Sequence, residues 1–296
     1  MKEAENNIHA ADRLIAACRS KGAPVCVGID PVFNKLPDVM SGLDPLAAIE
    51  KFCLEVISAV AEHVPAIKPQ IACFERYGSQ GYAVYERVVQ AGREAGLFII
   101  GDAKRGDIGT SSAHYASGLL VGEEDSAVGC DALTVNSYLG LDGLEPFFKA
   151  GAAAGKGLFA LVRTSNPGGD KLQGLSLEDG RTVAEAVADM VADLGCRDVG
   201  ESGYSLLGAV VGATKPEDAA SLRQRMPQQI FLVPGFGAQG GSADDVRACF
   251  KPDGTGAIIT ASRSVLYAYN PADTDWPSAV EKAAIDLKRQ ISEVLA

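Results

Sequence analysis

The sequence predicts a (β/α)8 barrel with an extra N-terminal helix, forming a single domain over residues 1–296. Eight short apolar segments recur along the chain, and each is followed by a turn residue and then by a stretch with helical periodicity. The segments are almost continuously apolar, as expected of parallel strands that are covered on both faces. Eight alternations of strand and helix over this length favour a closed barrel. A doubly wound open sheet is the alternative, because sequence alone does not show closure.

The expected strands are short and evenly distributed. In chain order they cover residues 25–30, 66–70, 98–104, 132–136, 158–163, 207–213, 230–234 and 257–261. The longest segment without either periodicity is 164–181, which is rich in Gly, Ser and Asp. A loop of that length inside a compact domain is usually functional or disordered.

Helices are expected where apolar residues recur three and four positions apart, as Ile49, Phe52 and Val56 do. In chain order they cover residues 45–63, 82–95, 143–153, 183–194, 216–225, 244–250 and 279–295. A further helix over residues 9–19 precedes the first strand. We expect it to plug the bottom of the barrel.

Composition excludes several classes of partner. The net charge of −11 argues against nucleic acid and anionic membranes, and an anionic substrate then needs a local cationic pocket. Seven scattered cysteines without a CxxC motif indicate reduced core thiols, and three distant histidines show no metal-ligand spacing. The N-terminus has no signal-peptide apolar core, and no apolar run reaches membrane-spanning length. We therefore expect a cytoplasmic protein without a metal.

The strongest chemical signal is the run from Asp102 to Asp107, which contains Lys104 and follows the apolar third strand. Side chains two apart on a strand share a face, so Asp102 and Lys104 should point the same way. Asp107 lies beyond the strand end, where it can return to the same site or reach a partner. Burying such charges costs several kcal/mol per ion unless they pair. The run therefore indicates a catalytic site.

Other polar residues also lie at or just beyond the carboxyl ends of the expected strands, where barrel enzymes place their active sites. Taken together with the run above, they are Asp30, Lys68, Asp102, Lys104, Asn136, Arg163, Gln239 and Arg263. Each one alone is equally consistent with a helix cap or a solvated surface group. Their joint occurrence at one end of successive strands predicts a shared site.

Two of these positions indicate phosphate binding. The loop 234–241 after the seventh strand is glycine-rich and contains Gln239, so backbone N–H groups can approach an anion closely. After the eighth strand, Arg263 lies between Ser262 and Ser264 and is suited to a bidentate phosphate contact. Barrel enzymes often hold phosphate with the loops after strands seven and eight.

This set of motifs resembles the orotidine 5′-phosphate decarboxylases, in particular their longer bacterial subgroup. The resemblance runs from the first strand to the eighth. It is carried by Gly28-Ile29-Asp30-Pro31, Ile67-Lys68-Pro69, Asp102-x-Lys104-x-x-Asp107, Arg163-Thr164-Ser165-Asn166-Pro167-Gly168-Gly169, the loop 234–241 and Ser262-Arg263-Ser264. The resemblance implies cofactor-free conversion of orotidine 5′-monophosphate to uridine 5′-monophosphate and CO₂, in de novo pyrimidine biosynthesis.

The resemblance also implies catalytic roles for four residues. Lys104 would stabilise negative charge at C6 of the pyrimidine and then protonate it. Asp102 would lie near the departing carboxylate. Lys68 and Asp107 would complete an alternating charge network around Lys104.

The same resemblance implies the binding residues and a homodimer. Asp107 and Ile108 would enter the neighbouring subunit's site, so that the active sites are shared. The expected substrate contacts are Asp30 to ribose, Ser165 to the pyrimidine, and Gln239 and Arg263 to phosphate. Asn136 and Asn166 are expected to bind the substrate as well. Relatives commonly carry threonine where Ser111 stands, and Thr110 precedes it, so either hydroxyl is a candidate for that contact.

Two alternatives remain open from the sequence. One is a Mg²⁺-dependent sugar-phosphate decarboxylase or aldolase of the same superfamily, which would need a further carboxylate. The other is a non-catalytic nucleotide-binding barrel. Such a protein would be expected to lose part of the charged set Lys68, Asp102, Lys104 and Asp107, all of which are present.

Overall fold

Eight parallel strands close into one barrel, in which each strand pairs with its neighbours in sequence order and β8 pairs with β1. The computed structural model describes residues 8–122, 129–213, 216–236 and 243–296. The strands are Val25–Ile29 (β1), Ala66–Pro69 (β2), Phe98–Arg105 (β3), Ala132–Val135 (β4), Gly157–Arg163 (β5), Leu207–Val211 (β6), Phe231–Pro234 (β7) and Ala257–Ala261 (β8). Closure confirms the predicted barrel, and the open doubly wound alternative is wrong.

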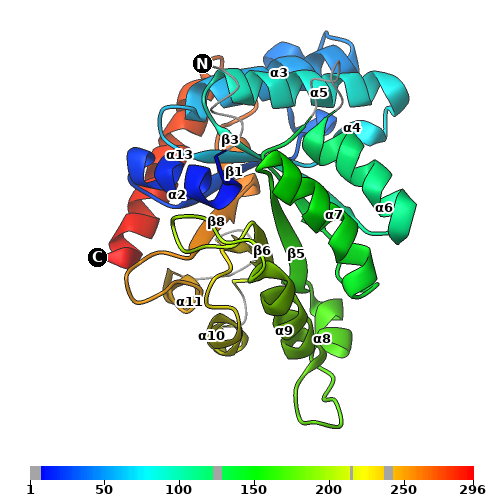
Figure 1. Cartoon of the computed structure of the whole chain (residues 1–296). Coiled ribbons are helices and arrows are strands. Elements are labelled where there is room, and N and C mark those ends of the chain that lie inside the picture. Colours follow the sequence, from blue (N-terminus) through cyan, green and yellow to red (C-terminus); the bar gives the residue numbers. More distant parts are fainter. Residues whose placement is uncertain (1–7, 123–128, 214–215, 237–242) are drawn as a thin grey trace.

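Helices surround the barrel, and each of the predicted helices is present (Figure 1). They are Ala10–Lys21 (α2), Pro45–Val60 (α3), Ala72–Glu75 (α4), Gly78–Glu94 (α5), Gly109–Ala116 (α6), Leu141–Ala154 (α7), Pro167–Gln173 (α8), Val183–Gly195 (α9), Pro216–Arg225 (α10), Ala243–Arg247 (α11), Arg263–Leu266 (α12) and Trp276–Leu295 (α13). Two 3-10 turns, Phe33–Lys35 (η1) and Asp38–Met40 (η2), precede α3, and a π turn, Ser117–Val121 (η3), extends α6.

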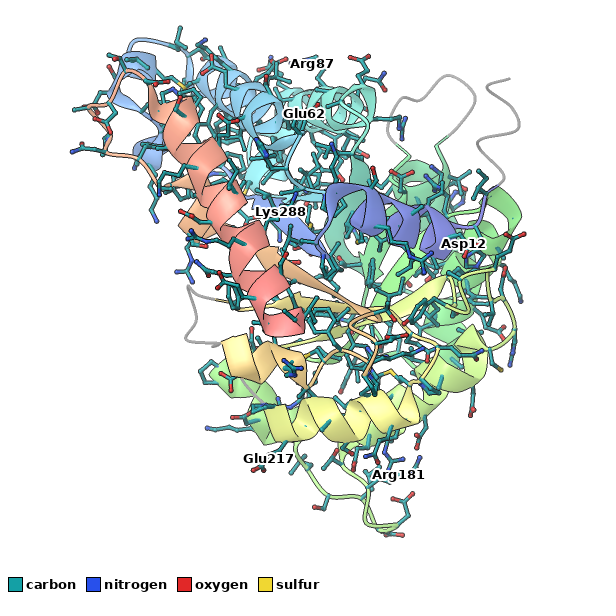
Figure 2. All side chains as sticks on the ribbon, turned by 90° about the vertical axis from the view of Figure 1, so that its left-hand side faces the viewer. Asp12, Glu62, Arg87, Arg181, Glu217 and Lys288 are labelled. Atoms are coloured by element: carbon teal, nitrogen blue, oxygen red, sulfur yellow. The ribbon has the colours of Figure 1, made fainter. Side chains whose placement is uncertain are left out.

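Local signals explain where the helices begin and which face they bury. Asp44 caps α3 by accepting hydrogen bonds from the first-turn backbone, and Pro45 occupies the first turn. Thr182 and Glu185 form a reciprocal capping box at the start of α9. Charged side chains such as Arg87 and Lys288 extend from the outer helices (Figure 2). The buried faces therefore turn towards the strands.

Helix α2 closes the floor of the barrel, as predicted. Its Ala10 and Leu14 pack in one buried cluster with Phe98, Ile100 and Phe159 from the strands. A second and larger cluster lies between the strands and the outer helices. Side chains of α2 and of the strands therefore fill the N-terminal end of the barrel interior.

The segment 164–181 is more ordered than the sequence predicts, because it contains α8 and a short bridge between Ser176 and Thr182. Gly168 and Gly169 lower intrinsic helix propensity, so the pattern gives no helical signal. Side-chain contacts to Asp170 and Gln173 hold the helix instead. The expectation of an irregular loop is therefore wrong for residues 167–173.

None of the seven cysteines, all of which lie among the described residues, forms a disulfide, in agreement with the predicted reduced thiols. Within the described residues, none of the helices combines the length and apolar character needed to cross a membrane.

Candidate active site

A cavity of about 410 Å³ opens at the carboxyl ends of the strands. Its walls come from the ends of β2 to β7 and from the segment that follows β5. The lining residues are Lys68, Asp102, Lys104, Thr134, Leu161, Thr164, Ser165, Asn166, Val210, Leu232 and Pro234. The predicted Lys68, Asp102, Lys104, Ser165 and Asn166 are thus brought together in one chain.

Asp102 is the centre of the cavity's charge network and is only 5% exposed. The Lys68 Nζ lies 2.5 Å from Asp102 Oδ2, and Lys104 Nζ pairs with Oδ1. Gln70 Nε2 donates to Oδ2 at 3.1 Å, and Thr134 Oγ1 donates to Oδ1 at 3.1 Å. Both carboxylate oxygens therefore have a cation and a neutral donor, which compensates the cost of burying the charge.

The two lysines determine the ionisation of this network. Burial alone would raise the pKa of Asp102, but the ammonium groups of Lys68 and Lys104 outweigh it and lower that pKa to about 2. Burial would likewise lower the pKa of Lys68, but Asp102 and Asp30 raise it above its ordinary value. At neutral pH Asp102 is therefore a carboxylate and Lys68 an ammonium.

Lys104 has a backbone conformation that directs it into this network. Its φ of 48° makes it the one non-glycine residue of the described chain with left-handed backbone, and the β3–β4 register shifts between Gly101 and Arg105. Such a conformation costs about 1 kcal/mol and occurs preferentially at functional sites. The hydroxyl of Thr134 accepts the N–H groups of Ala103 and Lys104, each at 3.0 Å, and so stabilises the bulge.

The predicted meeting of Asp102 and Lys104 is therefore confirmed, but regular strand alternation is not its cause. The bulge turns Lys104, whose side chain remains 46% exposed while those of Lys68 and Asp102 are 8% and 7% exposed. Lys104 is the cation of the network that is most accessible to a ligand.

Asp30 follows β1 at the same end of the barrel. Its Oδ1 is buried and has no hydrogen-bond partner within the described structure. Ser262 Oγ would lie only 1.9 Å from a Cβ at position 28, so the glycine there permits the segments after β1 and β8 to approach each other. A buried carboxylate oxygen without a partner suits a ligand hydroxyl.

Arg163 does not join the cavity, although the sequence places it among the strand-end residues. Its guanidinium contacts Asp170 at 2.5 Å and Asp218 at 2.8 Å, on the outer side of the barrel. It also donates to Gln173, whose side chain holds Thr164. Arg163 thus supports the segment that carries Ser165 and Asn166.

The remaining predicted residues do not line the cavity of a single chain. Asp107 is half-buried and accepts the Ile108 N–H at 2.8 Å, and Ile108 itself is 58% exposed. Ser111 is exposed on α6, and exposed Asn136 accepts the Tyr138 N–H at 3.0 Å.

The two predicted phosphate-binding residues have different outcomes. Arg263 begins α12 and is exposed, outside the cavity lining. Gln239 lies outside the described residues.

Gln70 and Thr134 are two contributors that sequence reasoning missed. Gln70 lies two positions after Lys68. Residues two apart on a strand share a face, so this spacing predicts that Gln70 points towards the same site. Thr134 is the polar residue within the otherwise apolar strand β4. A hydroxyl at such a position needs a partner, so it also marks the site.

Comparisons with known proteins agree with this geometry. Residues 24–274 match the family model described as "Orotidine 5'-phosphate decarboxylase / HUMPS family". An orotidine 5′-phosphate decarboxylase of Rhodopirellula baltica is 43% identical over 95% of this chain and 98% of its own length. The Deinococcus radiodurans protein of the same name is 40% identical over 93% of this chain and 94% of its own.

Solved structures give the same result. The chain superimposes on a candidate orotidine 5′-phosphate decarboxylase from Streptomyces avermitilis with a TM-score of 0.83 and 38% identity, covering 97% of this chain and 96% of that one. OMP decarboxylase of Leishmania donovani gives a TM-score of 0.76 and 30% identity, covering 97% and 99%. On its motifs, its barrel and these matches over nearly its whole length, this chain belongs to the orotidine 5′-phosphate decarboxylase family.

Proposed function

We propose that this chain converts orotidine 5′-monophosphate to uridine 5′-monophosphate and CO₂ without a cofactor, and that Lys104 delivers the proton to C6. The observation that carries the proposal is the buried carboxylate of Asp102 between Lys68 and Lys104, at the wall of a cavity of about 410 Å³. Family membership supports the reaction, and the charge network supports the mechanism.

The chemistry needs charge stabilisation at one carbon. Breaking the bond between C6 and the carboxylate releases CO₂ and leaves an electron pair in the plane of the ring, where delocalisation is poor. A fixed ammonium beside C6 stabilises that pair through the whole step, because it needs no reorganisation. Lys104 then gives its proton to C6 and regains one from water.

Asp102 has two effects in this mechanism. It fixes the ammonium of Lys104, with which it pairs directly. Its negative charge would also lie close to the substrate carboxylate, so that loss of CO₂ relieves a repulsion. Lys68 holds the other oxygen of Asp102 and keeps the carboxylate oriented.

The binding residues complete the proposed site. The unpartnered Oδ1 of Asp30 would accept a ribose hydroxyl, and Ser165 and Asn166 at the cavity wall would contact the pyrimidine. Arg263 would bind the phosphate together with Gln239. Binding energy from the distant phosphate then contributes to orientation at C6 and raises the rate of the chemical step.

A homodimer accounts for the residues that one chain leaves outside its cavity. Exposed apolar side chains lie on or just before α6 and α7, two helices that pack together; they are Ile108, Tyr115, Tyr138, Leu139 and Leu141. An exposed apolar group of this kind is typical of an interface. We propose that a second copy covers it and receives Asp107 and Ile108, with Ser111 or Thr110 nearby, and that Asn136 contributes from this rim.

The first experiment mixes the purified protein with orotidine 5′-monophosphate in excess EDTA and follows loss of the orotate absorbance. Rapid formation of uridine 5′-monophosphate is expected. Inactivity that is replaced by Mg²⁺-dependent turnover of a sugar phosphate would assign the chain to the metal-dependent alternative. Nucleotide binding without turnover of either substrate would favour the non-catalytic barrel.

Shared sites are tested by complementation between two inactive variants. Lys104→Ala and Asp107→Asn should each lose activity. Mixing equal amounts under exchange conditions should restore about a quarter of the wild-type rate, because about half of the dimers are then mixed and each mixed dimer has one intact site of two. Mixtures that stay inactive while subunits exchange would contradict the shared site.

A further inference from the structure

Tyr267 joins the two segments that carry the proposed ribose and phosphate contacts. It follows α12, which begins at Arg263, and its hydroxyl reaches the segment after β1. There it donates to the carbonyl oxygen of Asp30 at 2.9 Å and accepts the N–H of Val32 at 2.9 Å. One hydroxyl therefore fixes the backbone on both sides of Pro31.

Aromatic and cation–π contacts fix the orientation of the Tyr267 ring, and with it the position of the hydroxyl. The ring stacks on Phe52 with the ring centroids 6.1 Å apart and an interplanar angle of 9°. Tyr269 meets it edge-on at 6.4 Å, and the Lys35 ammonium lies 5.3 Å from the ring centroid. Burial raises the pKa of Tyr267, so the hydroxyl remains a donor at neutral pH.

Tyr267 belongs to the same backbone turn as Arg263. Its N–H donates to the carbonyl oxygen of Arg263 at 3.3 Å, and the N–H of Leu266 donates to that of Ser262 at 2.8 Å. Ser262 in turn fills the space above Gly28. The segments after β1 and after β8 are thus joined by the tyrosine hydroxyl and by close packing.

We propose that Tyr267 is a positioning residue that sets the separation between Asp30 and Arg263, and so selects nucleoside 5′-monophosphates over ligands that engage only one of the two. This inference rests on the proposed function, because that function assigns ribose to Asp30 and phosphate to Arg263. A ligand that spans both contacts requires them at a fixed separation. A ligand that uses one of them tolerates a shift of the other.

The chain offers a matched control for removing the hydroxyl. Tyr269 lies in the same aromatic group, 6.3 Å from Phe52, and its hydroxyl donates to the carbonyl oxygen of Lys35 at 2.8 Å. Tyr269→Phe therefore loses a hydrogen bond of the same kind to the same stretch of chain, but away from Asp30. Tyr267→Phe retains the stacked ring, so both variants should fold.

The experiment measures the affinities of both variants for uridine 5′-monophosphate and for uridine, together with kcat, KM and the unfolding midpoint. Tyr267→Phe should weaken binding of the monophosphate about tenfold, because both hydrogen bonds of the hydroxyl are lost, and weaken binding of uridine by much less. KM should rise by a similar factor. Tyr269→Phe should leave both affinities and KM near the wild-type values.

The outcomes separate this inference from the proposed function. If the wild-type chain does not turn over orotidine 5′-monophosphate, the proposed function and the positioning role of Tyr267 are both contradicted. If the wild-type chain does turn it over, two results contradict the positioning role and leave the proposed function intact. In the first, Tyr267→Phe lowers the affinities for the monophosphate and for uridine by the same factor; in the second, its affinities match those of Tyr269→Phe. A merely structural role would lower the unfolding midpoint without changing the preference for the monophosphate over uridine.

Discussion

Asp102 lies at the carboxyl end of the barrel, its mouth, and Asp131 lies at the N-terminal end, its floor. Both are buried carboxylates that contact two cations. Asp131 precedes β4, contacts Arg13 of α2 at 2.5 Å and Lys156 at 3.6 Å, and accepts the Ile99 N–H at 2.9 Å. As at the mouth, burial opposes ionisation of Asp131, but its two cations outweigh it and lower its pKa. The ionic composition of the two networks is therefore nearly the same.

The networks differ in what lies beside them. The network at the mouth borders the cavity, and its Lys104 has left-handed backbone and a half-exposed side chain. At the floor, Arg13 fastens the plugging helix to the barrel, and regular strand begins directly after Asp131. A buried ion triad is therefore no sign of a catalytic site by itself. An adjoining cavity and a strained cation distinguish the site from the structural triad.

The largest expected effect separates the two networks by activity. Lys104→Ala should lower kcat by at least about a thousandfold while the barrel still folds, since it removes both charge stabilisation and the proton donor. Lys156→Ala at the floor serves as the matched control and should retain kcat. The measurement is steady-state turnover with circular dichroism as a check of folding. Near-normal activity of Lys104→Ala would contradict its assigned role.

The next effect concerns the rim of the mouth. Arg263→Ala should weaken binding of uridine 5′-monophosphate by about 2–4 kcal/mol, because a charge-assisted bidentate contact is lost. Stability should change little, since the side chain is exposed. Calorimetric titration measures the first quantity and denaturant unfolding the second. Unchanged affinity would place the phosphate elsewhere.

At the floor, the same kind of charge removal should affect stability and leave chemistry unchanged. Asp131→Asn keeps an acceptor for Ile99 but leaves Arg13 and Lys156 without their shared anion. We expect the free energy of unfolding to fall by about 2–3 kcal/mol, less than for a fully buried pair because Arg13 has access to solvent. Urea denaturation measures this value. The kcat of the folded variant should match the wild type, and a large loss of kcat would break the distinction between floor and mouth.

The smallest effect is on the acid side of the stability profile. The pKa of Asp102 is lowered from 3.8 to about 2, so its stabilisation is present above about pH 4 and is lost as pH falls towards 2. This loss amounts to about 2 kcal/mol. Asp102→Asn should therefore flatten the decline in unfolding free energy between pH 4 and pH 2, and Asp131→Asn should flatten it similarly. A slope equal to the wild type in both variants would contradict these lowered pKa values.

Much of the fold could be predicted because its signals are local. Apolar runs marked all eight strands to within about two residues. The helices that were missed are short, like α4 and α12, or depend on side-chain partners outside the helix. In α8, Asp170 is held by Arg163 rather than by helical propensity.

The site was predictable in its residue types but not in its detailed geometry. Lys68, Asp102 and Lys104 do meet. The bulge at Lys104 depends on the Thr134 hydroxyl from the neighbouring strand, which no local pattern shows. Arg163 turns outward because Asp218 lies far along the chain on α10, so strand-end position alone could not assign it. Side-chain partners distant in sequence account for these differences.

The contacts of α2 also constrain when the floor of the barrel can fold during synthesis. Arg13 pairs with Asp131, and Asp12 accepts the N–H groups of Glu201 and Ser202 at 3.0 and 2.7 Å. During synthesis, α2 leaves the ribosome before Asp131, Glu201 and Ser202. The floor therefore cannot close until the chain has been synthesised through Ser202, and until then the apolar face of α2 lacks part of the buried cluster in which it packs.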